Sequence, residues 1–268
     1  MQPSTALQRT VASARRLSVL AVVPFVVAVL RWRDLTATAA ATATQYSVTF
    51  PTPHSFISLW SFVNAPTDTS AGSTGDVPLV VDVGFGILFV VALSIYVGLS
   101  GLLLAGYLGS IAEGVASGAF DFEANVRQYA RSMVVYEALW ILVLLGLASG
   151  ALWVPVALPV MVVGLFIAAY LTYLTPYLIV VGDRGLVDAV RRSVALTTQR
   201  RAAAVAFAGF VAAGAVFSVP VSMLVYGNGI TGAVFAAALT APAGFLASVF
   251  FVELTRDLDG GGDRSIPA

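Results

Sequence analysis

Long uncharged runs separate the few charged residues of this chain, and they restrict its fold more than any other feature. From Ser132 to Val181, about 50 residues, the only charged side chain is Glu137. A bilayer core about 30 Å thick is crossed by about 20 apolar residues in a helix. One helix of 50 residues would be about 75 Å long, so this run must hold two spans joined by a turn.

The composition supports a membrane protein and excludes several functional classes. Only 10% of the 268 residues are charged and the mean hydropathy is +0.91, whereas an ordinary soluble domain has about 25% charged residues. The net charge is zero, which gives no support for a nucleic-acid partner. Cysteine is absent and His54 is the single histidine, so disulfides, thiolate metal sites and histidine clusters are excluded. We expect an all-α, polytopic transmembrane helical bundle with no cofactor and no metal site.

Apolar runs and the turn signals between them predict six spans in one transmembrane domain, residues 1–255. The spans are expected at about 17–33, 79–110, 132–150, 155–181, 202–226 and 230–254. The connecting segments are an outer loop at 34–78, inner segments at 111–131 and 182–201, and a flexible cytoplasmic tail at 256–268. A cleaved secretory signal is the alternative for residues 1–33. Arg31 and Arg33 favour a retained span, because the region before a cleavage site is normally uncharged.

The arginines predict the orientation of this arrangement. Twelve of the fourteen fall in segments that share one side of the membrane. They are Arg9, Arg15, Arg16, Arg127, Arg131, Arg184, Arg191, Arg192, Arg200, Arg201, Arg256 and Arg264. Arg31 and Arg33 fall on the other side. The positive-inside rule therefore places both termini in the cytoplasm of a multi-pass protein of the cell membrane.

A short apolar cluster interrupts the outer loop. Residues 54–63 hold Phe56, Ile57, Leu59, Trp60, Phe62 and Val63. The cluster is too short to span a bilayer, so we expect an aromatic patch that packs on the helix ends or lies in the headgroup layer. The alternative is a lid over a ligand path.

The stretch from Pro176 to Thr197 organises the rest of the chain. An apolar span containing Pro176 ends at a Gly182–Gly185 turn, which includes Asp183, and an arginine-bearing helix follows. The apolar positions of that helix recur every four residues, at Leu186, Val190 and Val194. This pattern is typical of a helix in the inner interface, with Arg191 and Arg192 directed toward water and phosphate. Asp183, Arg191 and Arg192 are therefore candidate functional residues.

The same stretch resembles the membrane domain found beside some glycerophosphodiester phosphodiesterases. It is also similar to stand-alone multi-pass proteins of unknown function in bacteria and archaea, including salt-loving archaea. The matching residues are Ala189, Arg191, Arg192, Ser193, Leu196 and Thr197. The resemblance implies six spans with cytoplasmic amphipathic connectors. It does not imply phosphodiesterase activity, because the catalytic part of those enzymes is a separate soluble barrel with metal-binding carboxylates and histidines.

Glu137 is the candidate polar residue within a span. Ionisable groups at membrane depth usually face the bundle interior or a water-filled cavity. A proton or cation relay needs a second group at similar depth, and the sequence shows none. The simpler interpretation places Glu137 near the inner surface, paired with Arg131, Arg191 or Arg192.

Small residues define a candidate helix-packing face. Gly101, Ala105 and Gly109 recur at intervals of four, which lets one helix approach another closely. Residues 98–101 also match the Gly-x-Ser-Gly pattern of rhomboid intramembrane proteases. No histidine follows Ser100 to accept its proton, so the packing interpretation is favoured.

These observations predict a non-enzymatic membrane protein without catalytic residues, acting as a scaffold, accessory or regulatory subunit. Its expected partners are the lipid bilayer and either a membrane protein or anionic headgroups at the inner surface. The alternative is a transporter or permease subunit with a polar path near Glu137. An intramembrane enzyme is the weaker alternative.

Overall fold

The computed structural model describes residues 3–31, 47–53, 56–63 and 83–260, and in these ranges every regular element is a helix. Four helices are long and apolar enough to cross a membrane, or five spans result if a bent N-terminal pair counts as one. The expectation of an all-α protein with several membrane-length helices is therefore confirmed. The six spans and the orientation stay predictions. Most of the outer loop, including His54, and tail residues 261–268 lie outside the described residues.

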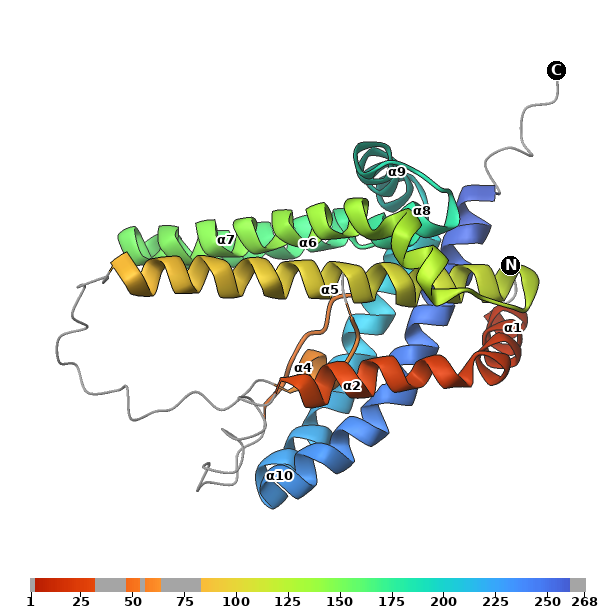
Figure 1. Ribbon diagram of the computed structural model, residues 1–268, viewed down its shortest axis with the longest axis horizontal. Helices are drawn as coiled ribbons and strands as arrows, with labels where there is room; N and C mark the ends of the chain where they lie inside the picture. The colour runs from red at the N-terminus through yellow and green to blue at the C-terminus, as the bar shows by residue number, and fades with distance from the viewer. Residues whose placement is uncertain (1–2, 32–46, 54–55, 64–82, 261–268) are drawn as a thin grey trace.

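Helices α5 (Val83–Ser117) and α6 (Phe122–Trp153) form a long hairpin and run side by side (Figure 1). Gly118 follows α5 with φ +84°, a left-handed conformation in which glycine carries no steric penalty. The Asp121 side chain caps α6 by accepting a backbone N–H at 3.1 Å. The helices thus continue through most of the predicted inner segment 111–131, and a short turn connects them.

The small-residue face of α5 lies against α6. A Cβ added at Gly101 would lie 2.6 Å from the backbone of Val134, and one at Gly109 would lie 2.7 Å from the Asn125 side chain. Ala105, between the two glycines, is fully buried. In lipid, close backbone approach of this kind replaces the hydrophobic effect as the force that holds helices together.

The helix that follows α6 is broken near its end. After a single 3-10 turn (Pro155–Ala157), α7 (Leu158–Thr172) is followed directly by α8 (Thr175–Val181). The break falls just before Pro176, which cannot donate a backbone hydrogen bond. Helix α9 (Leu186–Gln199) then crosses the long axis of the molecule and is seen nearly end-on in Figure 1.

Helix α10 (Arg201–Gly260) is a hairpin rather than one straight rod. Sixty helical residues would extend about 90 Å, which is far longer than a bilayer is thick. Gly229, with φ 55° and ψ −138°, breaks the helix into arms 201–228 and 230–260, and Figure 1 shows the resulting bend. The break lies between the spans predicted at 202–226 and 230–254.

The N-terminal helices meet at a sharp angle. Helix α1 (Pro3–Arg16) leads through the 3-10 helix η1 (Ser18–Ala21) into α2 (Val22–Leu30), with a bend of 84° between the two directions. Helix α2 packs along α10, whereas α1 crosses the end of the bundle at which α10 ends (Figure 1).

Residues 47–53 and 56–63 enter the bundle, where they contact α2, α5 and α10, and they include the short helix α4 (Leu59–Phe62) (Figure 1). Ile57 and Val63 are at most 1% exposed. Pro51 and Phe62 lie against Gly214, and Ile57 lies against Gly244, in the middle of the two arms of α10. The prediction of a patch on the helix ends or in the headgroup layer was therefore wrong.

Two serines of α10 satisfy the extended backbone of this segment. The Ser47 N–H donates to Ser222 Oγ at 3.1 Å, and the Thr49 N–H donates to Ser218 Oγ at 3.1 Å. Ser218 and Ser222 are fully buried and four residues apart, so both hydroxyls point from one face of the helix.

The short helix α4 is fixed at its N-terminus and through its tryptophan. Ser58 and Ser61 form a reciprocal capping box at its N-terminus. The indole Nε1 of Trp60 donates to the Ala28 carbonyl of α2 at 2.8 Å. Both arrangements satisfy polar groups that would otherwise be buried without a partner.

An aromatic cluster joins α7 and α8 to both arms of α10. Phe251 is fully buried at its centre. Its ring centroid lies 5.3–5.7 Å from those of Tyr173, Tyr177, Phe210 and Phe250. Contacts of this kind add specific edge and tilted geometries to the packing of the bundle.

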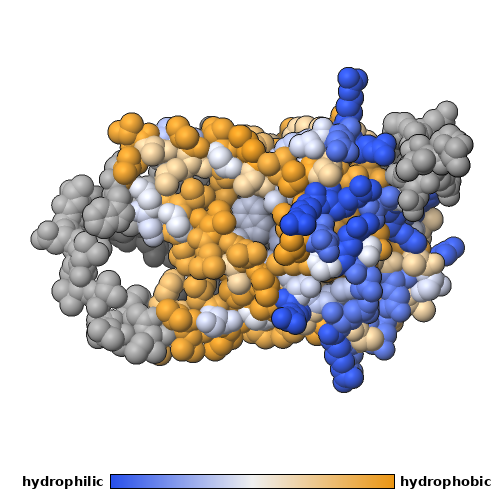
Figure 2. All heavy atoms as spheres, turned by 90° about the horizontal axis from the view of Figure 1, so that it is seen from above, coloured by the Kyte–Doolittle hydropathy of each residue, from blue (hydrophilic) through white to orange (hydrophobic). Residues whose placement is uncertain are grey.

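Charged residues gather at one end of the molecule, which we call the charged end. It comprises α1, the turn at residues 117–121, α9 and residues 253–260 of α10. Figure 2 shows hydrophilic side chains concentrated on this side and apolar side chains over most of the remaining visible surface. Away from the charged end, large aliphatic residues of α5, α6 and α7 are exposed, as expected for helices that face lipid.

We predict that Gly244→Ala displaces the buried segment. A Cβ at Gly244 would lie 1.9 Å from the Ile57 carbonyl oxygen, so either α10 or the segment must move. The expected loss of stability is about 1–3 kcal/mol, the usual cost of overpacking, measured by thermal unfolding in detergent.

Gly209→Ala is the matched control on the same helix, because no atom lies within 4 Å of the added Cβ. It should be neutral or stabilise by up to about 1 kcal/mol through helix propensity. Equal effects of the two substitutions would contradict the tight contact at Gly244.

Candidate functional site

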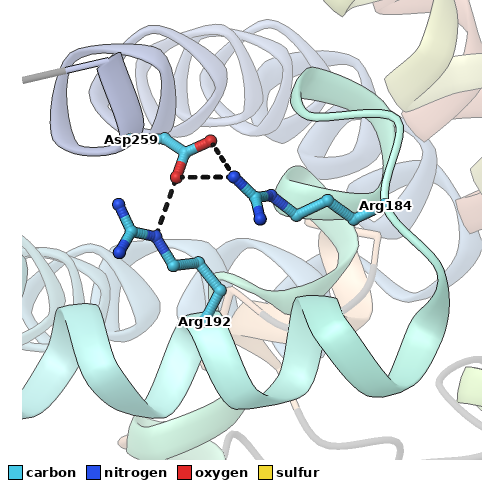
Figure 3. Close-up of polar contacts among 3 residues, drawn as sticks. All are labelled: Arg184, Arg192 and Asp259. Atoms are coloured by element: carbon cyan, nitrogen blue, oxygen red, sulfur yellow. Dashed lines mark hydrogen bonds and ion pairs between the residues drawn. The ribbon is translucent and has the colours of Figure 1, made fainter. Parts of the chain in front are cut away.

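The last turns of α10 carry the carboxylate that holds α9 in place. Asp259 Oδ1 accepts a hydrogen bond from Arg192 Nε at 2.8 Å, and Oδ2 accepts one from an Arg184 terminal nitrogen at 2.9 Å (Figure 3). Arg184 lies in the turn before α9 and Arg192 lies within it. One carboxylate therefore fixes both the start and the middle of the crosswise helix.

The Asp259 group is more buried than its two partners. Its side chain is 14% exposed, against 36% for Arg184 and 31% for Arg192. The apolar run of α10 ends at Leu254, so the carboxylate lies beyond the apolar part of the helix. Burial alone would raise its pKa, but the hydrogen bonds and charges of the two guanidinium groups outweigh burial and lower it.

A second carboxylate of α10 holds α1. Glu253 Oε1 accepts a hydrogen bond from Ser13 Oγ at 2.9 Å, and Oε2 accepts one from Thr10 Oγ1 at 3.3 Å. Thr10 and Ser13 are three residues apart on one face of α1. The two crosswise helices, α1 and α9, are thus both attached to the final two turns of α10.

The turn between α8 and α9 is fixed from α6. Asp183 adopts φ 49°, which is uncommon for a residue other than glycine, and its Oδ1 accepts from Gln128 Nε2 at 3.0 Å. The Arg184 side chain folds back over Gly182, where a Cβ would lie 2.7 Å from its Nε. A glycine at 182 therefore leaves room for the arginine that reaches Asp259.

The buried face of α9 is made of four of the six residues that the sequence analysis singled out in this helix. Ala189, Ser193, Leu196 and Thr197 are each at most 3% exposed. Ser193 Oγ donates at 2.8 Å to the carbonyl of Leu171, one of the last carbonyls of α7, which lack partners within that helix. The expected apolar residues Leu186, Val190 and Val194 are only half-buried.

Two cavities open at the charged end. The larger, about 430 Å³, lies between α1, α5 and α10. It is lined by Arg9, Ala12, Ser13, Arg16, Val115, Glu253, Arg256 and Asp257. The smaller, about 300 Å³, lies between α5, α6 and α8, and it shares Arg256 with the first.

The predicted site residues are not brought together. Arg192 and Asp183 lie at the charged end and are held by hydrogen bonds, whereas Arg191 is exposed and forms no ion pair with a described residue. Glu137 lies in the apolar part of α6 and is 8% exposed.

The expected pairing of Glu137 with an arginine is absent among the described residues. Arg192 instead pairs with Asp259, and Arg131 and Arg191 are exposed. Glu137 Oε1 is buried without a hydrogen-bond partner there. The interpretation of Glu137 as part of a surface ion pair was therefore wrong.

The carboxylates that organise the charged end were not predicted as site residues. Asp259 falls in the stretch 256–268 that the sequence interpretation assigned to a flexible tail, but α10 continues helically to Gly260. A signal was present, because Glu253 lies at the end of an apolar span and Asp257 and Asp259 follow it directly, so a continued helix presents these carboxylates to neighbouring helices.

No family model matches the chain, and neither the curated proteins nor the solved structures provide a match to it. Among the described residues there is also no group of three or more acidic, histidine or cysteine side chains that could hold a metal ion. The chemistry of the charged end therefore follows from its own residues.

Asp259→Asn should release α9 from α10. We expect a loss of about 1–2 kcal/mol at pH 7, since hydrogen bonds to charged groups are lost while both arginines stay partly solvated. Because the native pKa is lowered, the contribution of Asp259 is fully present above the unfolded carboxyl pKa of about 4. It is lost as the pH falls through the lower native value, so wild type and variant should converge in strong acid.

Thermal unfolding in detergent between pH 3 and pH 8 measures this difference, with Asp257→Asn as the control. Asp257 is exposed and forms no ion pair with a described residue. A difference between Asp259→Asn and wild type that does not vary with pH would contradict the assignment.

Proposed function

We propose that this chain is an integral protein of the cell membrane with six spans and with its charged end in the cytoplasm. The membrane-length helices α5, α6, α7 with α8, and the two arms of α10 supply five of these spans. The bent pair of α1 and α2 supplies the sixth, with α1 lying along the surface. Twelve of the fourteen arginines then lie on the cytoplasmic side, in agreement with the positive-inside rule.

Its proposed role is that of a non-enzymatic scaffold, accessory or regulatory subunit. The observation that carries this proposal is the attachment of two crosswise helices to the same two turns of α10, through Glu253 and Asp259. The charged end is thereby a fixed platform rather than a set of loose loops. A fixed surface of this kind suits the binding of a partner because little ordering entropy is lost on association.

The resemblance of residues 176–197 to the membrane domain beside glycerophosphodiester phosphodiesterases supports the same architecture. In that family the domain accompanies a catalytic part that is a separate unit. A supporting role for the present chain is consistent with that arrangement.

A cysteine-accessibility experiment tests the orientation. The chain has no cysteine, so Asp188→Cys on α9 and Asn228→Cys at the bend of α10 each introduce a single thiol, and both positions are exposed. A membrane-impermeant maleimide added to intact cells should label position 228 and should leave position 188 unlabelled until the cells are opened. The reverse pattern would contradict the orientation.

Affinity purification in mild detergent tests the role. The wild-type chain should retain a stoichiometric protein partner, whereas Glu253→Gln with Asp259→Asn should retain it at least about tenfold less well, because both crosswise helices lose their attachment. Asp257→Asn is the matched control and should behave as wild type. A chain that purifies alone, or a double variant that retains the partner fully, would argue against a platform for protein binding.

A transporter or permease subunit is the second candidate, and one observation favours it. Glu137 is a buried carboxylate without a hydrogen-bond partner among the described residues, and such groups at membrane depth often lie on ion paths. Neither cavity at the charged end is lined by Glu137, which favours the scaffold. Proton flux into vesicles that contain the purified chain separates the two, since Glu137→Gln should abolish the flux of a relay. Flux that is absent from wild type, or unchanged in the variant, removes this candidate.

A further inference from the structure

Three arginines from two helices converge on the larger cavity of the charged end. Arg9 and Arg16 are seven residues apart, about two turns, and so share one face of α1. Arg256 reaches the cavity from the last turns of α10. We call these three residues the arginine pocket.

The guanidinium groups of this pocket have free hydrogen-bonding capacity. None of the three forms an ion pair with a described residue, whereas Arg184 and Arg192 are held by Asp259 and Arg127 by Glu123. The pocket therefore differs from the group formed by Arg184, Arg192 and Asp259, in which both arginines are held by a carboxylate, and it differs from exposed Arg191 because its three arginines line one cavity.

Two carboxylates also line the cavity, and only one of them is engaged. Glu253 accepts the hydroxyls of Thr10 and Ser13, so its oxygens are committed to holding α1. Asp257 is exposed and forms no ion pair with a described residue. Three guanidinium groups thus face two carboxylates, which leaves a net positive charge around the opening.

The position of the pocket is set by the bend between α1 and α2. The chain turns by 84° between α1 and the apolar helix α2 that follows it, so α1 runs across the end of the bundle. The hydroxyl contacts to Glu253 hold α1 there. If α2 crosses the bilayer as proposed, Arg9 and Arg16 lie at the depth of the lipid headgroups.

We propose that the arginine pocket binds a phosphate group, either on the headgroup of an anionic phospholipid or as a free phosphate. Guanidinium groups present paired N–H donors that match phosphate oxygens, and charge-assisted bonds of this kind are strong. A cavity of about 430 Å³ is within the range of small-ligand sites. The site is distinct from Arg191 and Arg192 on α9, where the sequence placed contact with headgroups.

The test uses the purified full-length chain and two separate ligands. Native mass spectrometry of the chain in detergent, with equal amounts of phosphatidylcholine and phosphatidylglycerol added, measures retention of the anionic lipid. Titration of inorganic phosphate in the same detergent without added lipid, followed by calorimetry, measures binding of the free anion. The lipid measurement rests on the proposed membrane location and the phosphate titration does not, so the two can fail separately.

Arg16→Gln with Arg256→Gln should lower the affinity for the ligand that binds by at least about tenfold, because two of three charge-assisted contacts are lost. Arg191→Gln removes an exposed arginine of the same end and should change the affinity less than about twofold. Circular dichroism and size-exclusion profiles establish that the variants are folded. Asp257→Asn should strengthen binding, since it removes a carboxylate that repels the anion.

Each outcome either supports or overturns phosphate binding in the arginine pocket. Selective retention of phosphatidylglycerol, or saturable binding of phosphate, with loss in the paired variant supports it and identifies the source of the phosphate group. Absence of both, an equal loss in Arg191→Gln, or weaker anion binding in Asp257→Asn overturns it. The last two results would indicate general surface attraction or a site for cations.

Discussion

A backbone polar group cannot be left unpaired in lipid, and this constraint governs the arrangement of the whole bundle. Irregular backbone at membrane depth needs protein partners for its polar groups. Residues 56–63 are buried almost completely among α2, α5 and α10, whereas Val48 and Phe50 are exposed. Ser218 and Ser222 supply hydroxyls to the N–H groups of Ser47 and Thr49. Gly244 allows the Ile57 carbonyl oxygen to approach α10 closely. The small residues of α10 are therefore required by the segment that they surround.

The same constraint explains how the broken helix α7–α8 is stabilised. Its interruption leaves backbone carbonyls without partners, and the hydroxyl of Ser193 binds one of them. In return, the hydroxyls of Tyr170 and Tyr173 donate to the carbonyls of Thr197 and Ala203, on either side of the junction between α9 and α10. Each discontinuity in a helix is thus matched by a side chain from the next.

Much of the helical architecture could be predicted from local pattern. The lengths of the apolar runs, the break at Gly229 and the amphipathic helix after Asp183 all follow from periodicity, glycine and charge. These signals act within a few residues of one another, so one sequence is enough to reveal them.

The tertiary relations could not be predicted in this way. Ser218 and Ser222 are indistinguishable in sequence from other small residues of an apolar helix, and their partners lie about 170 residues away. Glu253 lies at the end of the last predicted span and Asp259 in the predicted flexible tail, so neither was singled out. Glu137 was expected near the inner surface, paired with Arg131, Arg191 or Arg192, but Arg192 pairs with Asp259. Which charges pair depends on how the helices cross, and hydropathy does not specify that.

The attachment of both crosswise helices to the end of α10 also has a consequence for biosynthesis. Ser13 of α1 is synthesised 240 residues before Glu253, the carboxylate that holds it. Helix α9 is likewise synthesised before Asp259. Both crosswise helices can therefore be fixed only after residues 253–259 have been synthesised, and a chain that stopped before Glu253 would lack both attachments.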